Sequence, residues 1–225
     1  MFALVRDRPE SRKKNQSHIN ETLCSLIWNR LTAVSGALIN SGFLESHGMP
    51  DAKQYTPLMY ASNLGFHDTV KLLLERECGL LRRDQRGHSA LAVAISGRRP
   101  NVVDILLEQY NTDERKASLL ESDVKGWSIL MMMCYIGMTQ QARTLLSLVP
   151  PTDRPYVDYE DLLGQTALYY AASQGNMTLV QLLIEHGASL QANNRGRGPI
   201  DVAREKEHRE VADFIEEHKS PPSAA

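Results

Sequence analysis

The chain has 225 residues, of which 42% are apolar, and it carries a formal net charge of -2 at pH 7, with charges of both signs interspersed. This composition supports one large or two small folded domains, and it weighs against nucleic acid or an anionic membrane as the main partner. The three cysteines, Cys24, Cys78 and Cys134, have neither CxxC nor CxxH spacing, so we expect free thiols in a packed interior rather than a disulfide framework.

Residues 1–17 form a basic arm with few apolar side chains, and we expect this arm to be mobile and the tail at residues 220–225 to be disordered. Its opening, MFALVRDR, is too short to supply the apolar core of a signal peptide. No apolar run in the chain approaches the length of a membrane span. The predicted location is therefore cytoplasmic, with the nucleus as the alternative.

Residues 18–50 are predicted to form a degenerate pair of helices that caps the fold at its N-terminal end. The stretch ETLCSLIWNRLTAVSGALINSGFL begins at Glu21 and ends in an apolar pattern followed by glycine. That pattern aligns with a clearer helix later in the chain: Ala37, Leu38, Ile39 and Gly42 match Leu182, Leu183, Ile184 and Gly187.

Residues 51–219 contain five copies of one sequence pattern, and these units start near 51, 84, 123, 161 and 193. Each of the first four units opens its helical part with Thr or Ser and has Asp five residues earlier, and the fifth is fainter, with Asn193 and Gly198 in these places. Glycine stands two residues before this opening residue at Gly87, Gly126, Gly164 and Gly196. Asp followed by Gly predicts a tight turn, and Thr or Ser predicts a helix N-cap.

The clearest unit shows what the other positions are for. After Thr166, a first helix presents a small apolar face, Gly175 ends it, and a second helix carries a buried apolar stripe. These faces are Leu168, Ala171 and Ala172 in the first helix and Leu179, Val180, Leu182 and Leu183 in the second. One such pair cannot bury its own apolar face, so we expect the units to stack.

The period near 33 residues, the opening T-P-L at Thr56 and the recurring D-x-x-G-x-T/S frame resemble the ankyrin-repeat family. The resemblance covers roughly Asp51 to His218. It implies an all-α solenoid of stacked helix-turn-helix units with short β-turn fingers. It also implies a non-catalytic scaffold or adaptor, without a cofactor, that binds another protein through the concave face of the solenoid.

Several positions depart from this pattern. Arg98 and Glu207 replace the glycine between the two helices, with Gly97 as a substitute for the former, and Met133 and Cys134 replace small residues. Two units carry long loops after their second helices, which we expect to emerge near one another. Tyr156 and Tyr159, with the acidic residues beside them, either make these loops a second binding surface or leave them as spacers; a third possibility is that the loops cover apolar surface around Met131 to Tyr135.

The resemblance implies that partners contact turn tips and exposed positions of the first helices. Met131 and Met133 are predicted to be core, whereas the interface interpretation is narrowly favoured for Trp127, Met132 and Tyr135. The matching positions are Tyr55, Tyr60, Asn63, Leu64, His88, Val93, Ser96, Trp127, Met132, Tyr135, Ile136, Gln165, Tyr170, Ser173, Gln174, Arg195 and Arg197.

Two other classes of function stay open: a nucleic-acid-associated regulatory protein that uses the basic arm with Arg195 and Arg197, and an enzyme with an unrecognised site. The NNRGRGP stretch lacks the Gly-Lys-Ser/Thr of a phosphate loop. The seven histidines fall at loops and helix ends without metal-ligand spacing. We therefore predict no catalytic, cofactor or metal site. The oligomeric state is left open, with a monomer favoured.

Overall fold

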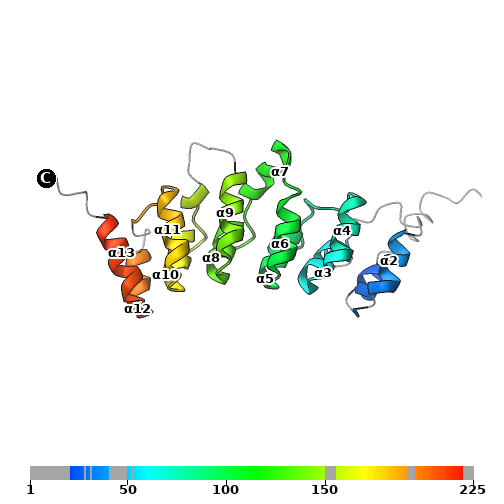
Figure 1. Ribbon diagram of the computed structural model, residues 1–225, viewed down its shortest axis with the longest axis horizontal. Helices are drawn as coiled ribbons and strands as arrows, with labels where there is room; N and C mark the ends of the chain where they lie inside the picture. The colour runs from blue at the N-terminus through cyan, green and yellow to red at the C-terminus, as the bar shows by residue number, and fades with distance from the viewer. Residues whose placement is uncertain are drawn as a thin grey trace, which may run out of the picture. The chain divides into compact units, whose positions relative to one another are not determined.

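The computed structural model describes residues 21–27, 29–30, 32–40, 50–51, 53–149, 156–191 and 196–219. The predicted arm and tail (1–17 and 220–225), Asn193 and Arg195 lie outside these ranges. The chain divides into two compact units, Met1–Ile105 and Leu106–Ala225. All the regular secondary structure assigned in the described ranges is helical, as the predicted all-α class requires (Figure 1).

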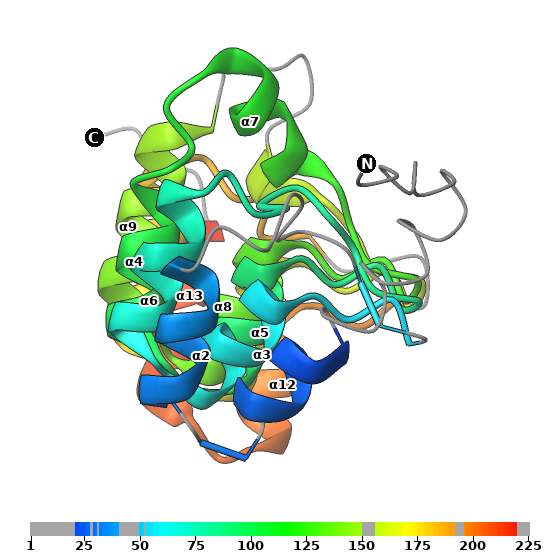
Figure 2. The ribbon, with the colours of Figure 1, turned by 90° about the vertical axis from the view of Figure 1, so that its right-hand side faces the viewer.

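Unit 1 holds a helix over residues 21–27 and then α2 (Thr32–Asn40), α3 (Pro57–Leu64), α4 (His67–Glu75) and α5 (Ala90–Ser96). Helix α6 (Pro100–Leu107) crosses the boundary between the units. Helix α3 packs against both α4 and α5. Figure 2 shows α3 and α5 on the side of the projecting turns and α4 on the far side.

Unit 2 begins its own helices with α7 (Asp113–Ala117) and the short 3-10 helix η1 (Ser118–Leu120). Three helix pairs follow: α8 (Ile129–Ile136) with α9 (Thr139–Leu148), α10 (Ala167–Ser173) with α11 (Met177–Glu185), and α12 (Pro199–Glu205) with α13 (Arg209–Lys219). A second 3-10 helix, η2 (Tyr156–Asp158), precedes α10. The first helices stack in order, since α10 packs against α8 on one side and α12 on the other.

An aspartate organises the turn that opens each of the first four repeats. In the fourth repeat, Asp161 Oδ1 accepts the backbone N–H groups of Leu163 at 2.8 Å and Gln165 at 2.9 Å. Asp51, Asp84 and Asp123 make the same pair of bonds to residues two and four positions on. The residue three positions after the aspartate has positive φ, which explains the recurring glycine.

In each of the first four repeats, the residue that opens the first helix caps it, as predicted. Thr56, Ser89, Ser128 and Thr166 each accept the N–H three residues on through the side-chain oxygen, at 3.2–3.3 Å. These bonds satisfy one of the orphan donors at each helix start.

The positions that depart from the repeat pattern keep the backbone of the pattern. Arg98 and Glu207 adopt the left-handed φ values (54° and 63°) that glycine adopts in the other repeats. Gly97 has φ -74°, so the prediction that it substitutes for the missing glycine is wrong. Met131 and Met133 are fully buried, which confirms their assignment to the core.

The two long loops meet inside unit 2. The Tyr156 hydroxyl donates to the backbone oxygen of Leu119 at 3.0 Å and accepts the N–H of Leu130 at 3.4 Å. Tyr156, Val157 and Leu119 are all buried. The predicted proximity of the loops is confirmed, and Tyr156 also contacts the start of α8 through Leu130. The alternative in which Tyr156 contacts a partner is excluded, because its ring lies in the interior.

The three cysteines are free and buried, as expected from their spacing. Burial raises the pKa of Cys24 and of Cys78 to about 12, and burial also raises the pKa of Cys134. Because the thiolate is the reactive form, each raised pKa lowers reactivity near neutral pH.

We expect iodoacetamide at pH 8 to modify the folded chain at none of the three thiols on the timescale on which it modifies glutathione. Unfolding in urea should expose all three. Mass spectrometry of the two time courses measures this, and rapid labelling of any cysteine in the folded chain would contradict the buried assignment.

Candidate functional site

The predicted site residues of unit 1 lie around the first two turns. The rings of Tyr55 and Tyr60 pack edge to face, with centroids 4.8 Å apart. The Tyr60 hydroxyl donates to Asp51 Oδ2 at 2.9 Å. Burial raises the pKa of Tyr60, and this hydrogen bond raises it further. Tyr60 therefore braces its own turn while its ring stays partly accessible. Leu64 and His88 are half-buried.

Three residues predicted to be exposed are buried. Tyr170 is 7% exposed, and its hydroxyl donates to Asp161 Oδ2 at 2.6 Å, with Gln165 Oε1 2.8 Å from the same hydroxyl oxygen. Val93 and Met132 stand at the same position in their repeats, nine residues after the turn aspartate, and they are 5% and 6% exposed. The prediction that these three side chains are exposed is therefore wrong.

Unit 2 gathers an aromatic cluster from two repeats, made of Trp127, Tyr135 and Tyr170. The Trp127 ring lies 4.6 Å from Tyr170 and 5.5 Å from Tyr135, and the two tyrosine rings are 6.0 Å apart. Trp127 ends the third turn, Tyr135 lies on α8 and Tyr170 on α10. Tyr135 is 46% exposed, so the cluster is a packed base with one accessible ring.

Sequence reasoning missed a tip cluster made of Val124, Leu162 and Leu163. These turn residues are 62%, 74% and 48% exposed. The Leu162 N–H donates to the Lys125 backbone oxygen at 3.1 Å, which joins the third and fourth turns. The signal was present in the sequence, since the third and fourth turns read DVKG and DLLG where the second reads DQRG. Apolar residues at turn tips are unusual unless they are covered.

The remaining predicted residues of unit 2 differ in accessibility. Ile136 and Gln165 are half-buried, whereas Gln174 and Arg197 are exposed. Arg197 forms an ion pair with Glu205, so part of the basic end predicted for the site is neutralised.

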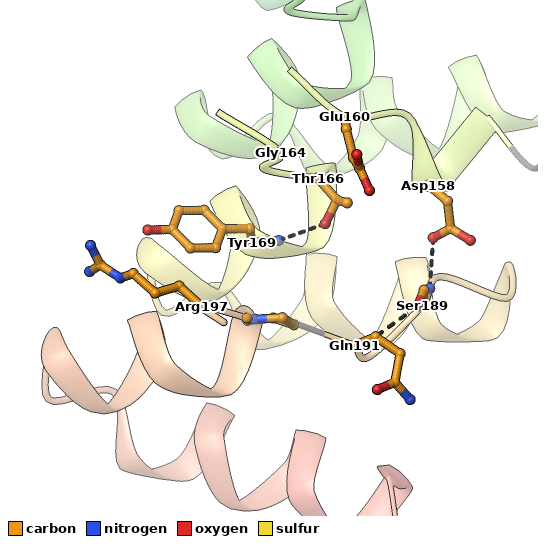
Figure 3. Close-up of a pocket in the computed structure, with 10 residues that line it drawn as sticks. Asp158, Glu160, Gly164, Thr166, Tyr169, Ser189, Gln191 and Arg197 are labelled. Atoms are coloured by element: carbon orange, nitrogen blue, oxygen red, sulfur yellow. Dashed lines mark hydrogen bonds between the residues drawn. The ribbon is translucent and has the colours of Figure 1, made fainter. Parts of the chain in front are cut away.

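A separate hollow of about 280 Å³ lies between the fourth and fifth repeats in unit 2 (Figure 3). Figure 3 shows Tyr169 and Arg197 at one end and Asp158 at the other. The polar groups here serve the fold: Asp158 Oδ1 accepts the Ser189 N–H at 2.7 Å, and Thr166 Oγ1 accepts the Tyr169 N–H at 3.3 Å.

A family model described as ankyrin repeats (3 copies) matches the chain twice, over residues 20–118 and over residues 130–223. The chain belongs to the ankyrin-repeat family. Ankyrin repeats generally mediate protein–protein interaction. Within the ranges that the structure describes, no group of three or more His, Cys, Asp or Glu side chains is placed to hold a metal ion, and no helix is both long and apolar enough to span a bilayer.

This ankyrin chain is 30% identical over 149 residues to the potassium channel AKT2/3 of Arabidopsis thaliana, which covers 66% of the chain and 17% of the channel. It is 31% identical over 168 residues to the ankyrin repeat and KH domain-containing protein mask-1 of Caenorhabditis elegans, covering 74% of the chain and 6% of that protein. The chain thus spans a small part of each relative.

Among solved structures, the ankyrin chain is similar to one chain of the complex between the Bd0816 predatory endopeptidase of Bdellovibrio bacteriovorus and the immunity protein Bd3460. The TM-score is 0.73 at 23% identity, with 87% of this chain and 96% of that chain covered. This similarity shows the fold.

Proposed function

We propose that the chain is a non-catalytic adaptor or scaffold of the cytoplasm, and that the tip cluster and the aromatic cluster of unit 2 form its principal protein-binding surface. One observation carries this proposal. Six large apolar side chains are exposed among the described residues, and four of them, Val124, Tyr135, Leu162 and Leu163, lie on the third and fourth repeats.

The arrangement of these side chains favours a docking surface over incidental exposure. The third turn links the two clusters, because Asp123 Oδ1 holds the backbone N–H groups of both Lys125 and Trp127 at 2.8 Å. The clusters are thus carried on a braced backbone, and a surface fixed before binding loses less conformational entropy when a partner arrives. A packed aromatic base with an accessible tyrosine is typical of an interface hot spot.

The proposal is tested by affinity capture from a cytosolic extract, followed by affinity measurement with each captured protein. The variant replaces Val124, Tyr135, Leu162 and Leu163 by serine. We expect it to lose the specific partners, and the single change Tyr135→Ser to cost about 2 kcal/mol of binding free energy if Tyr135 is a hot spot.

The matched control replaces the other two exposed apolar residues, Val34 and Leu81, by serine. It removes apolar surface elsewhere and should capture the same partners as the unmodified chain. If the fourfold variant keeps its helical circular dichroism and still captures every partner, the proposed surface is wrong.

A further inference from the structure

A hollow of about 460 Å³ lies in unit 1 between the first and second turns and helices α3 and α5, and a second one of about 410 Å³ adjoins it. Lys53, Tyr55 and Asn63 line both. The larger hollow extends along α5 as far as Ser96. The space therefore fits several residues of a bound chain rather than one small ion.

The only carboxylate that lines the larger hollow among the described residues is already engaged. Asp84 Oδ1 accepts the N–H groups of Arg86 and His88, both at 2.8 Å. Asp84 Oδ2 faces His88 Nδ1 at 3.3 Å. These contacts engage both oxygens of Asp84 within the second turn.

The cations of the hollow are available. Lys53 and Arg86 are exposed, and neither forms an ion pair with any residue that the structure describes. The Tyr55 hydroxyl, the Asn63 side-chain amide and the Ser96 hydroxyl also make no hydrogen bond within the described ranges. Two cationic side chains and three groups able to donate hydrogen bonds thus converge on one space.

We propose that this hollow binds a carboxylate-rich segment of a partner protein, as a second binding site that differs in chemistry from the apolar surface of unit 2. Carboxylate oxygens accept hydrogen bonds. Their negative charge would also pair with the positive charges of Lys53 and Arg86. The rings of Tyr55 and Tyr60 offer apolar area for the aliphatic part of the segment.

The geometry favours a peptide over a nucleic acid. The rings of Tyr55 and Tyr60 are inclined at 67° and pack against each other edge to face. Successive bases of a single strand stack on open aromatic faces. In this pair, the edge of one ring packs against the face of the other, so that face is not open to a base.

The experiment uses phage display to select peptides that bind the full chain from a random library of twelve-residue peptides. We expect the selected peptides to be enriched in Asp and Glu. Fluorescence anisotropy of a labelled peptide should show that Lys53→Glu with Arg86→Glu weakens binding by about tenfold or more, since charge-assisted hydrogen bonds are lost and repulsion is added. Asn63→Ala with Ser96→Ala should weaken it by a smaller factor without any change in charge.

The matched control is Lys71→Glu with Arg76→Glu, which makes the same change in charge on exposed residues of unit 1 outside the hollow. It should bind the peptide within about twofold of the unmodified chain, because exposed charges far from a ligand are screened by salt. Equal loss in the control, or selected peptides without acidic enrichment, would overturn the proposal.

Two further arms separate this site from its alternatives. A labelled single-stranded RNA that binds more tightly than the peptides, and loses binding in the Lys53/Arg86 variant, would assign the hollow to nucleic acid and overturn the peptide assignment. The fourfold serine variant of unit 2 should bind the acidic peptide normally, so failure of one site leaves the test of the other intact.

Discussion

Replacing Gly126 by alanine is expected to lower the free energy of unfolding by about 2–3 kcal/mol, because two costs add at this residue. Gly126 has φ +80°, a region that residues with a Cβ rarely adopt. A Cβ placed there would also lie 3.0 Å from both the Cα of Asp161 and the backbone nitrogen of Leu162. Backbone atoms cannot move aside as a flexible side chain can, so the third and fourth turns must separate.

The fifth repeat supplies the control. Gly196 occupies the same turn position with φ +72°, and a Cβ there would meet nothing within 4 Å. Gly196→Ala should therefore cost only the conformational part, about 1 kcal/mol. Urea denaturation followed by circular dichroism measures both variants. Equal losses would show that the close approach of the two turns carries no energy of its own.

Gly126→Ala also has a functional consequence. Separating the turns should break the bond from the Leu162 N–H to the Lys125 oxygen and so disturb the tip cluster. Partner binding through unit 2 should weaken in this variant even at temperatures where the helices remain folded.

The elements that local chemistry determines could be predicted from the sequence. The turn at Asp161 and the cap at Thr166 depend on side-chain oxygens that reach backbone groups two to four residues away. Such short-range bonds recur wherever the same residue types recur at the same spacing. The repeat frame therefore predicted both the turns and the helix starts.

The accessibility of the site could not be predicted in the same way. Tyr135 and Tyr170 both read as aromatic residues on first helices, yet one is exposed and the other is buried. The difference arises because Tyr170 reaches back nine residues to Asp161 Oδ2 and lies beneath the Trp127 ring of the preceding repeat. Contacts across repeats depend on stacking, and a pattern read along one repeat does not contain them.

The burial of Tyr156, which lies on an inserted loop, could not be predicted for the same reason: it depends on contacts with residues distant in the sequence. Its hydroxyl bonds to Leu119, which is 37 residues earlier in the chain, and to Leu130 at the start of α8. Two insertions that each look like spacers become one structural element when they meet. Tyr156 and Leu119 join the two insertions to each other, and Tyr156 joins them to the third repeat.

Tyr156→Phe is expected to lower the free energy of unfolding by about 1–3 kcal/mol, since it leaves the buried Leu119 oxygen and Leu130 N–H without their partner. Burial raises the pKa of Tyr156, so the hydroxyl stays protonated and can donate throughout the neutral range. Tyr156→Ala should cost more, about 3–5 kcal/mol, because it adds a cavity where the ring packs between the loops.

Tyr169→Phe is the matched control for the hydroxyl. Tyr169 is also buried, but its hydroxyl makes no hydrogen bond to any residue in the described ranges, so its removal should change stability by less than about 0.5 kcal/mol. Chemical denaturation of the three variants gives the comparison. If Tyr156→Phe is as stable as Tyr169→Phe, the bridge between the loops does not hold them. A loss confined to Tyr156→Ala would then mean that ring packing alone joins the two insertions.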